Sequence, residues 1–326
     1  MLESIGAEVE AVFESARPAV VKVKALHGGV TFCGSGFYIN EKGHVITALA
    51  IIGDSQEVQI VDSSGSYRAD VLGRDPRTGL AYLVRKLAIS GSHGEKELNI
   101  DRTPYLKFAE DHDLKPSSPV IAIGYPLDLP PTPIFGFVTG FDAFYNNRLF
   151  ATTHIRSDIG LAPGQLGGPM LNPKGEVVGM MVIAAERGRL SFAIPARAIS
   201  KAVKDIAKYG KVRHGWVGIG VHESQDNGGG ERKTQVSILF PNTPAEKSGL
   251  QVGDILLQVN GKEIRKPSDV LDIAYFSQVG EKVPVTVLRG DKVQTFVYEI
   301  VERPSPNLVT PPPAVAENAN ASLPAK

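Results

Sequence analysis

The sequence predicts a mostly-β protein in which two β-barrels are followed by a smaller α+β unit. It contains 34 glycines and 23 prolines, which interrupt many short runs of β-branched residues, as is typical of mostly-β architectures. The runs fall into two sets, residues 15–110 and 117–195, joined by the polar stretch Gly91–Thr103. Closure of each set into a barrel would remove exposed strand edges. A change in composition at Gly215 marks the start of the third unit.

The elements follow in order along the chain. Strands are predicted at residues 19–23, 36–39, 44–47, 57–61, 120–124 and 176–183. Pro195–Lys208 is predicted to be a helix because apolar residues recur there at helical spacing. These residues are Ala198, Ile199, Ala202, Val203 and Ile206. A short basic linker follows at residues 211–214. The stretch from Pro304 to Lys326 is rich in Pro, Ala and Asn, which predicts a disordered tail.

Composition and charge disfavour several classes of partner and cofactor. Thirty-five basic residues balance thirty-five acidic ones without a basic stripe, so a nucleic-acid or anionic-membrane partner has little electrostatic support. The single cysteine, Cys33, excludes an intrachain disulfide and a cysteine-based metal cluster, and no metal or other cofactor is expected. No apolar run approaches the ~20 residues that span a bilayer. The acidic start, Met1–Glu10, does not suit a secretory signal, so we expect a cytosolic protein or a trimmed mature form.

The most informative motif lies at residues 157–172, which read Ser-Asp-Ile-Gly-Leu-Ala-Pro-Gly-Gln-Leu-Gly-Gly-Pro-Met-Leu-Asn. It resembles the serine loop of trypsin-like proteases, and more narrowly that of the HtrA/Deg branch, where the pattern is T-D-A-x-I-N-P-G-N-S-G-G-P-L-x-N. In this resemblance the nucleophilic serine falls on Leu166. A leucine side chain has no hydroxyl with which to attack a carbonyl.

Two further motifs carry the same resemblance. Residues 34–37 and 43–47 resemble the family's approach to its catalytic histidine, which then falls on Ala50. Residues 75–83 resemble D-P-x-T-D-L-A-V-L, so the catalytic aspartate falls on Gly79, and Asp75 is expected to shape a turn. Acyl transfer on such a scaffold needs a hydroxyl, an imidazole and a carboxylate. The three degenerate positions therefore predict a pseudoenzyme, a protein that is not an enzyme.

The backbone of the loop is expected to survive without the triad. Gly164, Gln165 and Leu166 would form a vestigial oxyanion loop, and the Leu166 side chain would partly fill an apolar cleft. The alternative is that the glycines and Pro169 serve only the turn of the barrel. The other candidates for a base or a nucleophile, which offer no rescue, are His44, His112, His154 and Cys33.

The third unit, residues 215–303, resembles a PDZ domain of the HtrA type. Residues 215–219 read Gly-Trp-Val-Gly-Ile, and residues 244–261 match P-A-x-x-A-G-L-x-x-G-D-x-I-x-x-I-N-G. The resemblance implies that a partner's C-terminal segment adds as a strand beside a helix. The expected peptide-binding residues are Trp216, Val217, Gly218, Ile219, Val221, Val270 and Ile273.

Within this unit, Gly218 is expected to allow close backbone approach. The helix is expected to begin near Ser268 as its N-cap and to stop before Gly280 as its C-cap. An apolar groove predicts ligands with hydrophobic C-terminal residues. Trp216 is equally well interpreted as a packing anchor.

The resemblance as a whole implies two trypsin-like six-stranded β-barrels at 1–210, one PDZ domain at 211–303, and a tail at 304–326. The leading hypothesis is a catalytically inactive HtrA/Deg-like homologue that binds peptides or unfolded proteins as an adaptor, chaperone or regulatory subunit in protein quality control. A homotrimer, or a mixture with active homologues, is the expected assembly. One alternative is an active HtrA-type serine endopeptidase with a non-standard or partner-supplied site, and a second is a purely structural component. A trimmed chain would suggest a periplasmic or extracytoplasmic location.

Overall fold

The computed structural model describes residues 2–304 apart from 89–102, 111–113, 147 and 225–231. Almost all of the predicted polar connection 91–103 and of the predicted tail 304–326 lies outside the described residues. His112 lies outside them as well. The chain divides into two compact units between Val212 and Arg213. No helix in the described part of the chain is long and apolar enough to cross a membrane.

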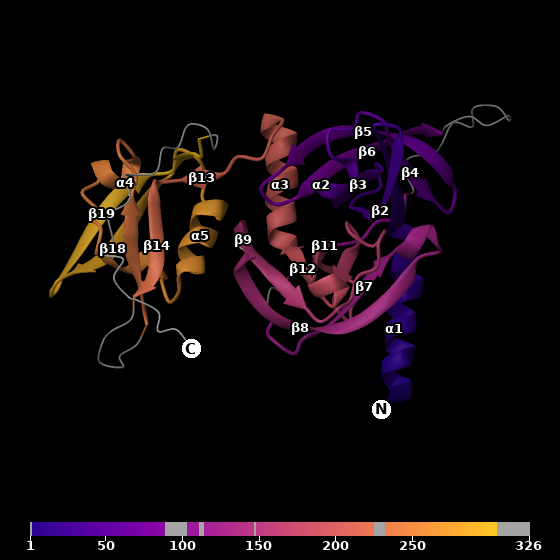
Figure 1. The fold of residues 1–326 in the computed structure, drawn as a ribbon, viewed down its shortest axis with the longest axis horizontal. Helices are drawn as coiled ribbons and strands as arrows, with labels where there is room; N and C mark the ends of the chain where they lie inside the picture. The colour runs from indigo at the N-terminus through magenta and orange to yellow at the C-terminus, as the bar shows by residue number, and fades with distance from the viewer. Residues whose placement is uncertain (1, 89–102, 111–113, 147, 225–231, 305–326) are drawn as a thin grey trace, which may run out of the picture. The chain divides into compact units, whose positions relative to one another are not determined.

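The first barrel closes in the strand order β1-β2-β3-β6-β5-β4 (Figure 1). Its strands are β1 (Val20–His27), β2 (Val30–Tyr38), β3 (His44–Ala48), β4 (Val58–Asp62), β5 (Gly65–Asp75) and β6 (Leu80–Ala88). All pairs of neighbouring strands are antiparallel. The short helix α2 (Leu49–Ile52) leaves the end of β3, which places it directly after the strand that the sequence predicted at 44–47.

The second barrel closes in the order β10-β11-β12-β9-β8-β7. Its strands are β7 (Pro119–Gly124), β8 (Thr132–Tyr145), β9 (Arg148–Ser157), β10 (Pro169–Leu171), β11 (Val177–Ala185) and β12 (Leu190–Pro195). Short 3-10 turns lie at η3 (Pro126–Asp128) and η4 (Glu186–Gly188), and η1 (Arg17–Ala19) precedes β1. The prediction of a mostly-β fold with two barrels is confirmed.

The largest core cluster lies between the two barrels and receives two helices. Strand residues such as Phe37 from the first barrel and Met180 from the second are fully buried in it. Helix α3 (Ala196–Tyr209) packs Ile199 and Ile206 into the same core and ends at Gly210, whose N–H donates to the Ile206 carbonyl at 2.8 Å. The predicted helix at 195–208 is therefore confirmed to within one residue at each end.

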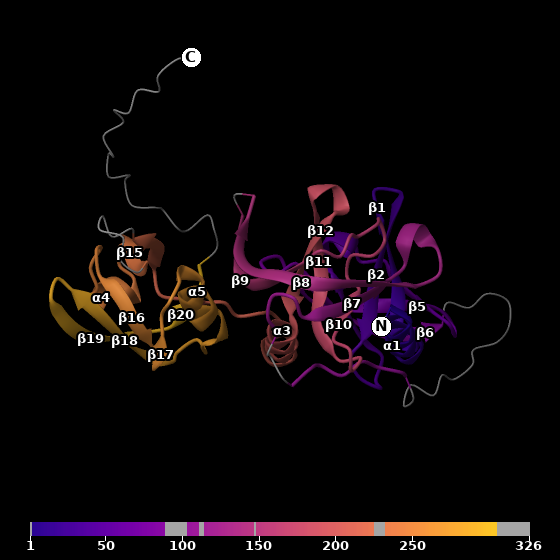
Figure 2. The same cartoon turned by 90° about the horizontal axis from the view of Figure 1, so that it is seen from below.

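Helix α1 (Leu2–Ala16) occupies the segment before Pro18. Its C-terminal half buries Val12 and Ala16 in the core between the barrels, whereas residues 3–8 are exposed. Figure 1 shows this helix alongside the barrels, with its first turns extending beyond them, and Figure 2 views it along its axis. The position of Val12 shows why this segment is ordered: its apolar face is covered by the barrels.

The second unit has a sheet in the order β14-β15-β16-β18-β19, with β17 paired to β16 and a separate pair β13-β20. Its strands are β13 (Gly215–Trp216), β14 (Ile219–Ser224), β15 (Lys233–Leu239), β16 (Ile255–Val259), β17 (Lys262–Glu263), β18 (Lys282–Arg289), β19 (Lys292–Glu299) and β20 (Val301–Glu302). Helices α4 (Pro244–Lys247) and α5 (Pro267–Phe276) pack on its core.

The ends of α5 differ from those predicted. The N-cap is Lys266, not Ser268, because Pro267 occupies the first helical position and the Asp269 carboxylate accepts the Lys266 N–H at 3.1 Å. The C-cap is Ser277, not Gly280, because the Ser277 N–H donates to the Ile273 carbonyl at 2.9 Å. The helix is therefore shorter at its C-terminal end than the spacing predicted.

Burial of His44 links the stability of the first unit to pH. His44 Nδ1 is hydrogen-bonded to the hydroxyl of Tyr82, a residue only 4% exposed. Burial, and to a smaller extent the charge of Lys42, lowers the pKa of His44 below its usual value. The neutral imidazole is thus the form that the folded state prefers.

We predict that the free energy of unfolding falls as the pH drops below the unfolded-state pKa of His44, about 6.5. Between pH 7 and 5, the free energy of unfolding should depend on pH more steeply in the unmodified protein than in the His44→Gln variant. The two slopes should differ by at most about 1.4 kcal/mol per pH unit. Urea unfolding followed by circular dichroism measures both slopes. Parallel curves for the two proteins would contradict the prediction.

Candidate functional site

The loop before β10 is fixed to the first barrel by one buried serine. Ser35 on β2 is fully buried, and its N–H donates to the Leu166 carbonyl at 2.8 Å. Its hydroxyl donates to the Gly164 carbonyl at 2.7 Å and accepts the N–H of Tyr125, which follows β7, at 2.9 Å. A single side chain therefore connects β2, the end of β7 and the loop.

The same loop leaves no room for side chains at its glycines. A Cβ on Gly167 would lie 2.1 Å from the Ser35 carbonyl oxygen, and the φ of Gly167 is +86°. The Thr47 hydroxyl donates to that same carbonyl at 2.7 Å. Gly167 is thus required for the close approach of the loop to β2.

Two N–H groups of this loop, at the positions expected to form the oxyanion hole, have no hydrogen-bond acceptor among the described residues. Within the described part of the chain, the N–H groups of Gly164 and Leu166 donate no hydrogen bond, whereas the Gln165 N–H donates to Ala162. Gln165 is 4% exposed, and its side-chain carbonyl accepts the Ala162 N–H at 2.7 Å. The buried amide therefore holds the turn, and two donors remain available to an anion.

Leu166 lies at the junction of the two barrels. It is half-buried and packs against the interior clusters of both, which include Ile51 in the first barrel and Met181 in the second. Its side chain is thus part of the hydrophobic packing between the barrels. It carries no group able to exchange a proton or attack a carbonyl.

The other two positions of the expected triad lie on adjoining segments. Ala50 is exposed on α2, and the N–H of its neighbour Leu49 donates to the Gly79 carbonyl at 2.7 Å. Gly79 has a φ of +76° and closes the turn that Asp75 shapes, as predicted. The Asp75 carboxylate accepts the Arg77 N–H at 3.2 Å and the Thr78 hydroxyl at 2.6 Å.

An ion-pair cluster lies beside the loop. Asp128 pairs with Lys22 at 2.5 Å and with Lys24 at 3.3 Å, both on β1. Hydrogen bonding to Lys22, followed by that to Lys24, lowers the pKa of the exposed Asp128 carboxyl. The N–H of the preceding Leu127 donates to the Pro163 carbonyl at 2.7 Å. This cluster therefore ties β1 to the segment that carries the loop.

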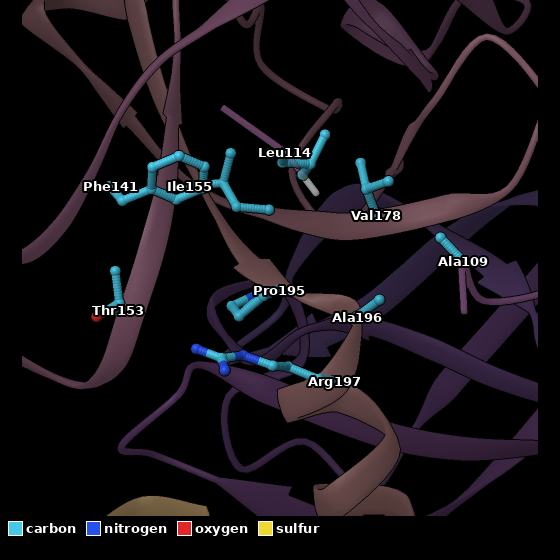
Figure 3. Close-up of a pocket in the computed structure, with 9 residues that line it drawn as sticks. All are labelled: Ala109, Leu114, Phe141, Thr153, Ile155, Val178, Pro195, Ala196 and Arg197. Carbon is cyan, nitrogen blue, oxygen red and sulfur yellow. The ribbon is translucent and has the colours of Figure 1, made fainter. Parts of the chain in front are cut away.

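A separate cavity of about 180 Å³ lies in the second barrel, away from this loop (Figure 3). Phe141 and Ile155 form part of its apolar wall, and Arg197 at the start of α3 extends toward Thr153. Among the described residues, no group of His, Cys, Asp and Glu side chains is arranged to hold a metal ion. None of the predicted site residues lines this cavity.

The expected peptide groove would lie between β14 and α5. Among the described strands, β14 pairs with β15 alone and is the end strand of its sheet, and α5 lies against it (Figure 1). Ile219 and Val221 on β14 are partly buried, and Val270 and Ile273 on α5 are 7% and 8% exposed. The structure therefore brings these four predicted residues together around one core.

The loop Trp216–Ile219 leads into β14. The carbonyls of Val217 and Gly218 accept the N–H groups of Ala245 at 3.0 Å and Phe240 at 2.9 Å. The N–H groups of Val217 and Gly218 donate to no described residue. Trp216 is placed differently: its ring packs against Phe240, 5.7 Å between centroids. Two backbone donors are thus free next to the open edge of β14.

Ser35 and Phe240 are site residues that sequence reasoning missed. Ser35 was visible only as the polar residue of a Gly-Ser-Gly segment, which is a weak signal for a structural hydrogen-bond centre. Phe240 directly precedes the Pro-Asn-Thr-Pro segment at 241–244. An aromatic residue at the end of a predicted strand does not by itself indicate which ring it contacts.

Comparison with known proteins identifies both units. The trypsin-like peptidase domain matches residues 34–180, and the PDZ domain matches residues 240–289. A protein of Marinomonas sp. (strain MWYL1), named "Probable periplasmic serine endoprotease DegP-like", is 32% identical over 83% of this chain and 57% of its own length. The serine endoprotease DegS of Salmonella typhimurium is 28% identical over 84% of this chain and 78% of its own length.

Solved structures share the fold. The HtrA-type protease AlgW with a tripeptide has a TM-score of 0.76 at 21% identity, covering 92% of this chain and 98% of that one. The serine endoprotease from Yersinia pestis has a TM-score of 0.66 at 24% identity, covering 91% and 98%. The chain spans little more than half the length of the DegP-like relative. The chain thus matches a trypsin-like peptidase domain followed by a PDZ domain, and over both it is similar to HtrA/DegP-type proteases.

The prediction that this chain is not an enzyme is contradicted by these comparisons. The relatives that match most of its length are named serine endoproteases. The prediction inferred loss of activity from side chains at three positions, Ala50, Gly79 and Leu166. Assignment of positions by motif says nothing of reacting groups that other residues or a partner chain would supply, and this is the physical reason for the error.

We predict that Ser35→Ala lowers the free energy of unfolding of the first unit by about 1–3 kcal/mol, because the Tyr125 N–H and the Gly164 carbonyl lose a buried partner. Ser63→Ala, at an exposed residue of the same barrel, is the matched control and should change stability by less than about 0.5 kcal/mol. Urea unfolding followed by circular dichroism measures both. Equal effects of the two substitutions would contradict the structural role of Ser35.

Proposed function

Because the chain matches a trypsin-like peptidase domain and a PDZ domain, we propose that it captures C-terminal or unfolded peptide segments of other proteins in the groove between β14 and α5. The observation that carries the proposal is the edge of β14, which no described strand covers, beside the N–H groups of Val217 and Gly218, which no described residue accepts. A peptide would add as a strand to this edge, and its terminal carboxylate would accept from the loop.

The side chains of the groove favour hydrophobic ligands. Ile219 and Val221 from the strand and Val270 and Ile273 from the helix are all apolar, so an apolar ligand side chain packed against them would not desolvate a polar group of theirs. The related AlgW structures were solved with a tripeptide and with a decapeptide. This supports, for the present chain, the binding of short peptide segments rather than of small cofactors.

For the protease domain, the names of the relatives favour serine-type endopeptidase activity in protein quality control. Gly164 and Leu166 would contribute the N–H groups of the oxyanion hole. Since Ala50, Gly79 and Leu166 lack the imidazole, carboxylate and hydroxyl of a triad, hydrolysis would use reacting groups at non-standard positions or from a partner subunit. Such a partner would be an active homologue in a mixed trimer.

Peptide capture also supports a role beyond cleavage. A chain that holds segments of unfolded proteins would act as an adaptor, a chaperone or a regulatory subunit toward such a partner. Helix α1, with exposed residues 3–8 beyond the barrels, provides a surface on which a homotrimer or mixed trimer would assemble.

We predict that Gly218→Ala lowers the affinity for a peptide with a hydrophobic C-terminus at least about tenfold, which is 1.4 kcal/mol. A Cβ at Gly218 would lie 2.3 Å from Thr243 Cβ, so the loop and its free N–H groups must shift. Gly261→Ala is the matched control, because Gly261 also has a positive φ but has nothing within 4 Å of its Cβ position. Fluorescence anisotropy with a labelled peptide measures both.

The same peptide with an amidated C-terminus separates carboxylate capture from general apolar binding. The amidated form should bind more weakly than the free acid to the unmodified protein. Equal affinities of the two peptides, or equal effects of the two glycine substitutions, would contradict the proposed groove.

We predict that casein is cleaved by the purified chain, either when it is alone or when it is mixed with an HtrA-type homologue. A fluorophosphonate probe followed by mass spectrometry should label a residue other than 166, since leucine cannot react. Cleavage only in the mixture would assign the reacting groups to the partner. Absence of cleavage and labelling under both conditions would contradict the endopeptidase activity while leaving the peptide-binding test independent.

A further inference from the structure

The second unit contains a hollow that the peptide groove does not use. It has a volume of about 440 Å³ and is lined by two aromatic residues, three prolines and one valine, together with the polar residues Asn242, Thr243, Lys247 and Glu302. We call it the Trp216 pocket, and its defining residues are Trp216, Phe240, Pro241, Pro244, Val301 and Pro304. None of these residues belongs to β14 or α5.

The direction of the Trp216 side chain separates the pocket from the groove. Gly215, the residue before it on β13, faces α5, because a Cβ there would lie 2.3 Å from the Ala274 carbonyl oxygen. Successive residues of a strand point to opposite faces. Trp216 therefore points away from α5, and the pocket lies on the other face of β13.

The chemistry of the pocket matches that of grooves that bind proline-rich segments. The Trp216 and Phe240 rings lie 5.7 Å apart at 56° and form an angled aromatic surface. Trp216 is only partly buried, and its indole N–H has no hydrogen-bond partner among the described residues. Aromatic side chains pack on the rings of a polyproline II helix, and an indole N–H needs an acceptor when it is covered.

The sequence places a suitable segment next to the pocket. The described chain ends at Pro304 on the rim, and residues 305–326 follow. Pro311, Pro312 and Pro313 come after a six-residue connection, 305–310, which spans up to roughly 20 Å when extended. That reach is sufficient for the proline run to return across the pocket from its own rim.

We propose that the Trp216 pocket binds the proline run Pro311–Pro313 of the same chain as a polyproline II segment, with the indole N–H donating to one of its carbonyls. Proline fixes φ near the polyproline II value, so little conformational entropy is lost on docking. A short tether gives an effective concentration of the order of 1 mM. A segment whose free Kd is about 0.1 mM would then be docked in roughly nine molecules of ten.

The experiment uses the intrinsic fluorescence of Trp216, the only tryptophan of the chain. The full-length variant with Pro311→Gly, Pro312→Gly and Pro313→Gly should show red-shifted emission and stronger quenching by acrylamide than the unmodified chain. A peptide of residues 307–316 added to this variant should reverse both changes saturably. The same peptide with its three prolines replaced by glycine should not.

Phe240→Leu in the triple-glycine background tests the pocket itself. It should weaken the response to the proline peptide while the circular dichroism spectrum is retained. Identical emission and quenching of the unmodified chain and the triple-glycine variant would overturn the proposal. So would a blue shift that grows with protein concentration, which indicates docking between copies. Displacement of the proline peptide by a hydrophobic C-terminal peptide would overturn it as well, by assigning the site to the β14–α5 groove.

Discussion

The hydrogen bonds of Ser35 are the constraint on which the protease-like unit depends. Two closed barrels each satisfy their own strand edges, so nothing in the ladders fixes one barrel relative to the other. Beside the shared hydrophobic core, Ser35 supplies a polar link between them through its N–H and its hydroxyl, both buried. This link passes through the loop 163–169. A change in the geometry of the loop would therefore also change how the two barrels pack against each other.

Packing and chemistry at the barrel junction can be separated on this basis. The backbone of the loop is held by Ser35 and by the buried amide of Gln165, and neither depends on the side chain at 166. Leu166 instead joins the interior clusters of both barrels. The site thus has a rigid frame and two free donors, with an apolar side chain where a reacting group is expected. Any endopeptidase activity must therefore use reacting groups other than the side chains of this loop.

Much of the fold could be predicted from the sequence, and the reasons differ between elements. Helix α3 and the barrel strands could be predicted from the regular spacing of apolar residues along the chain. The core between the barrels buries residues at these positions. The α5 caps could not be predicted well, because Pro267 and Asp269 compete with Ser268 for the helix start and only the backbone geometry decides between them. The direction of Trp216 depends on β13 pairing with β20, a contact about 85 residues away in sequence, which local patterns do not contain. Chemical activity was the least predictable property, because side chains at three positions do not determine whether reacting groups are supplied from elsewhere.

The length of the β14 edge also limits how many side chains of a bound peptide could be recognised. The strand has six residues, so it measures out a segment of about 20 Å. Only alternate side chains of an added strand would face α5, which leaves about three positions to be read. Main-chain pairing would supply the rest of the contact irrespective of ligand identity. Such a groove would distinguish classes of chain ends rather than single proteins, because many different proteins share the same residues at three positions.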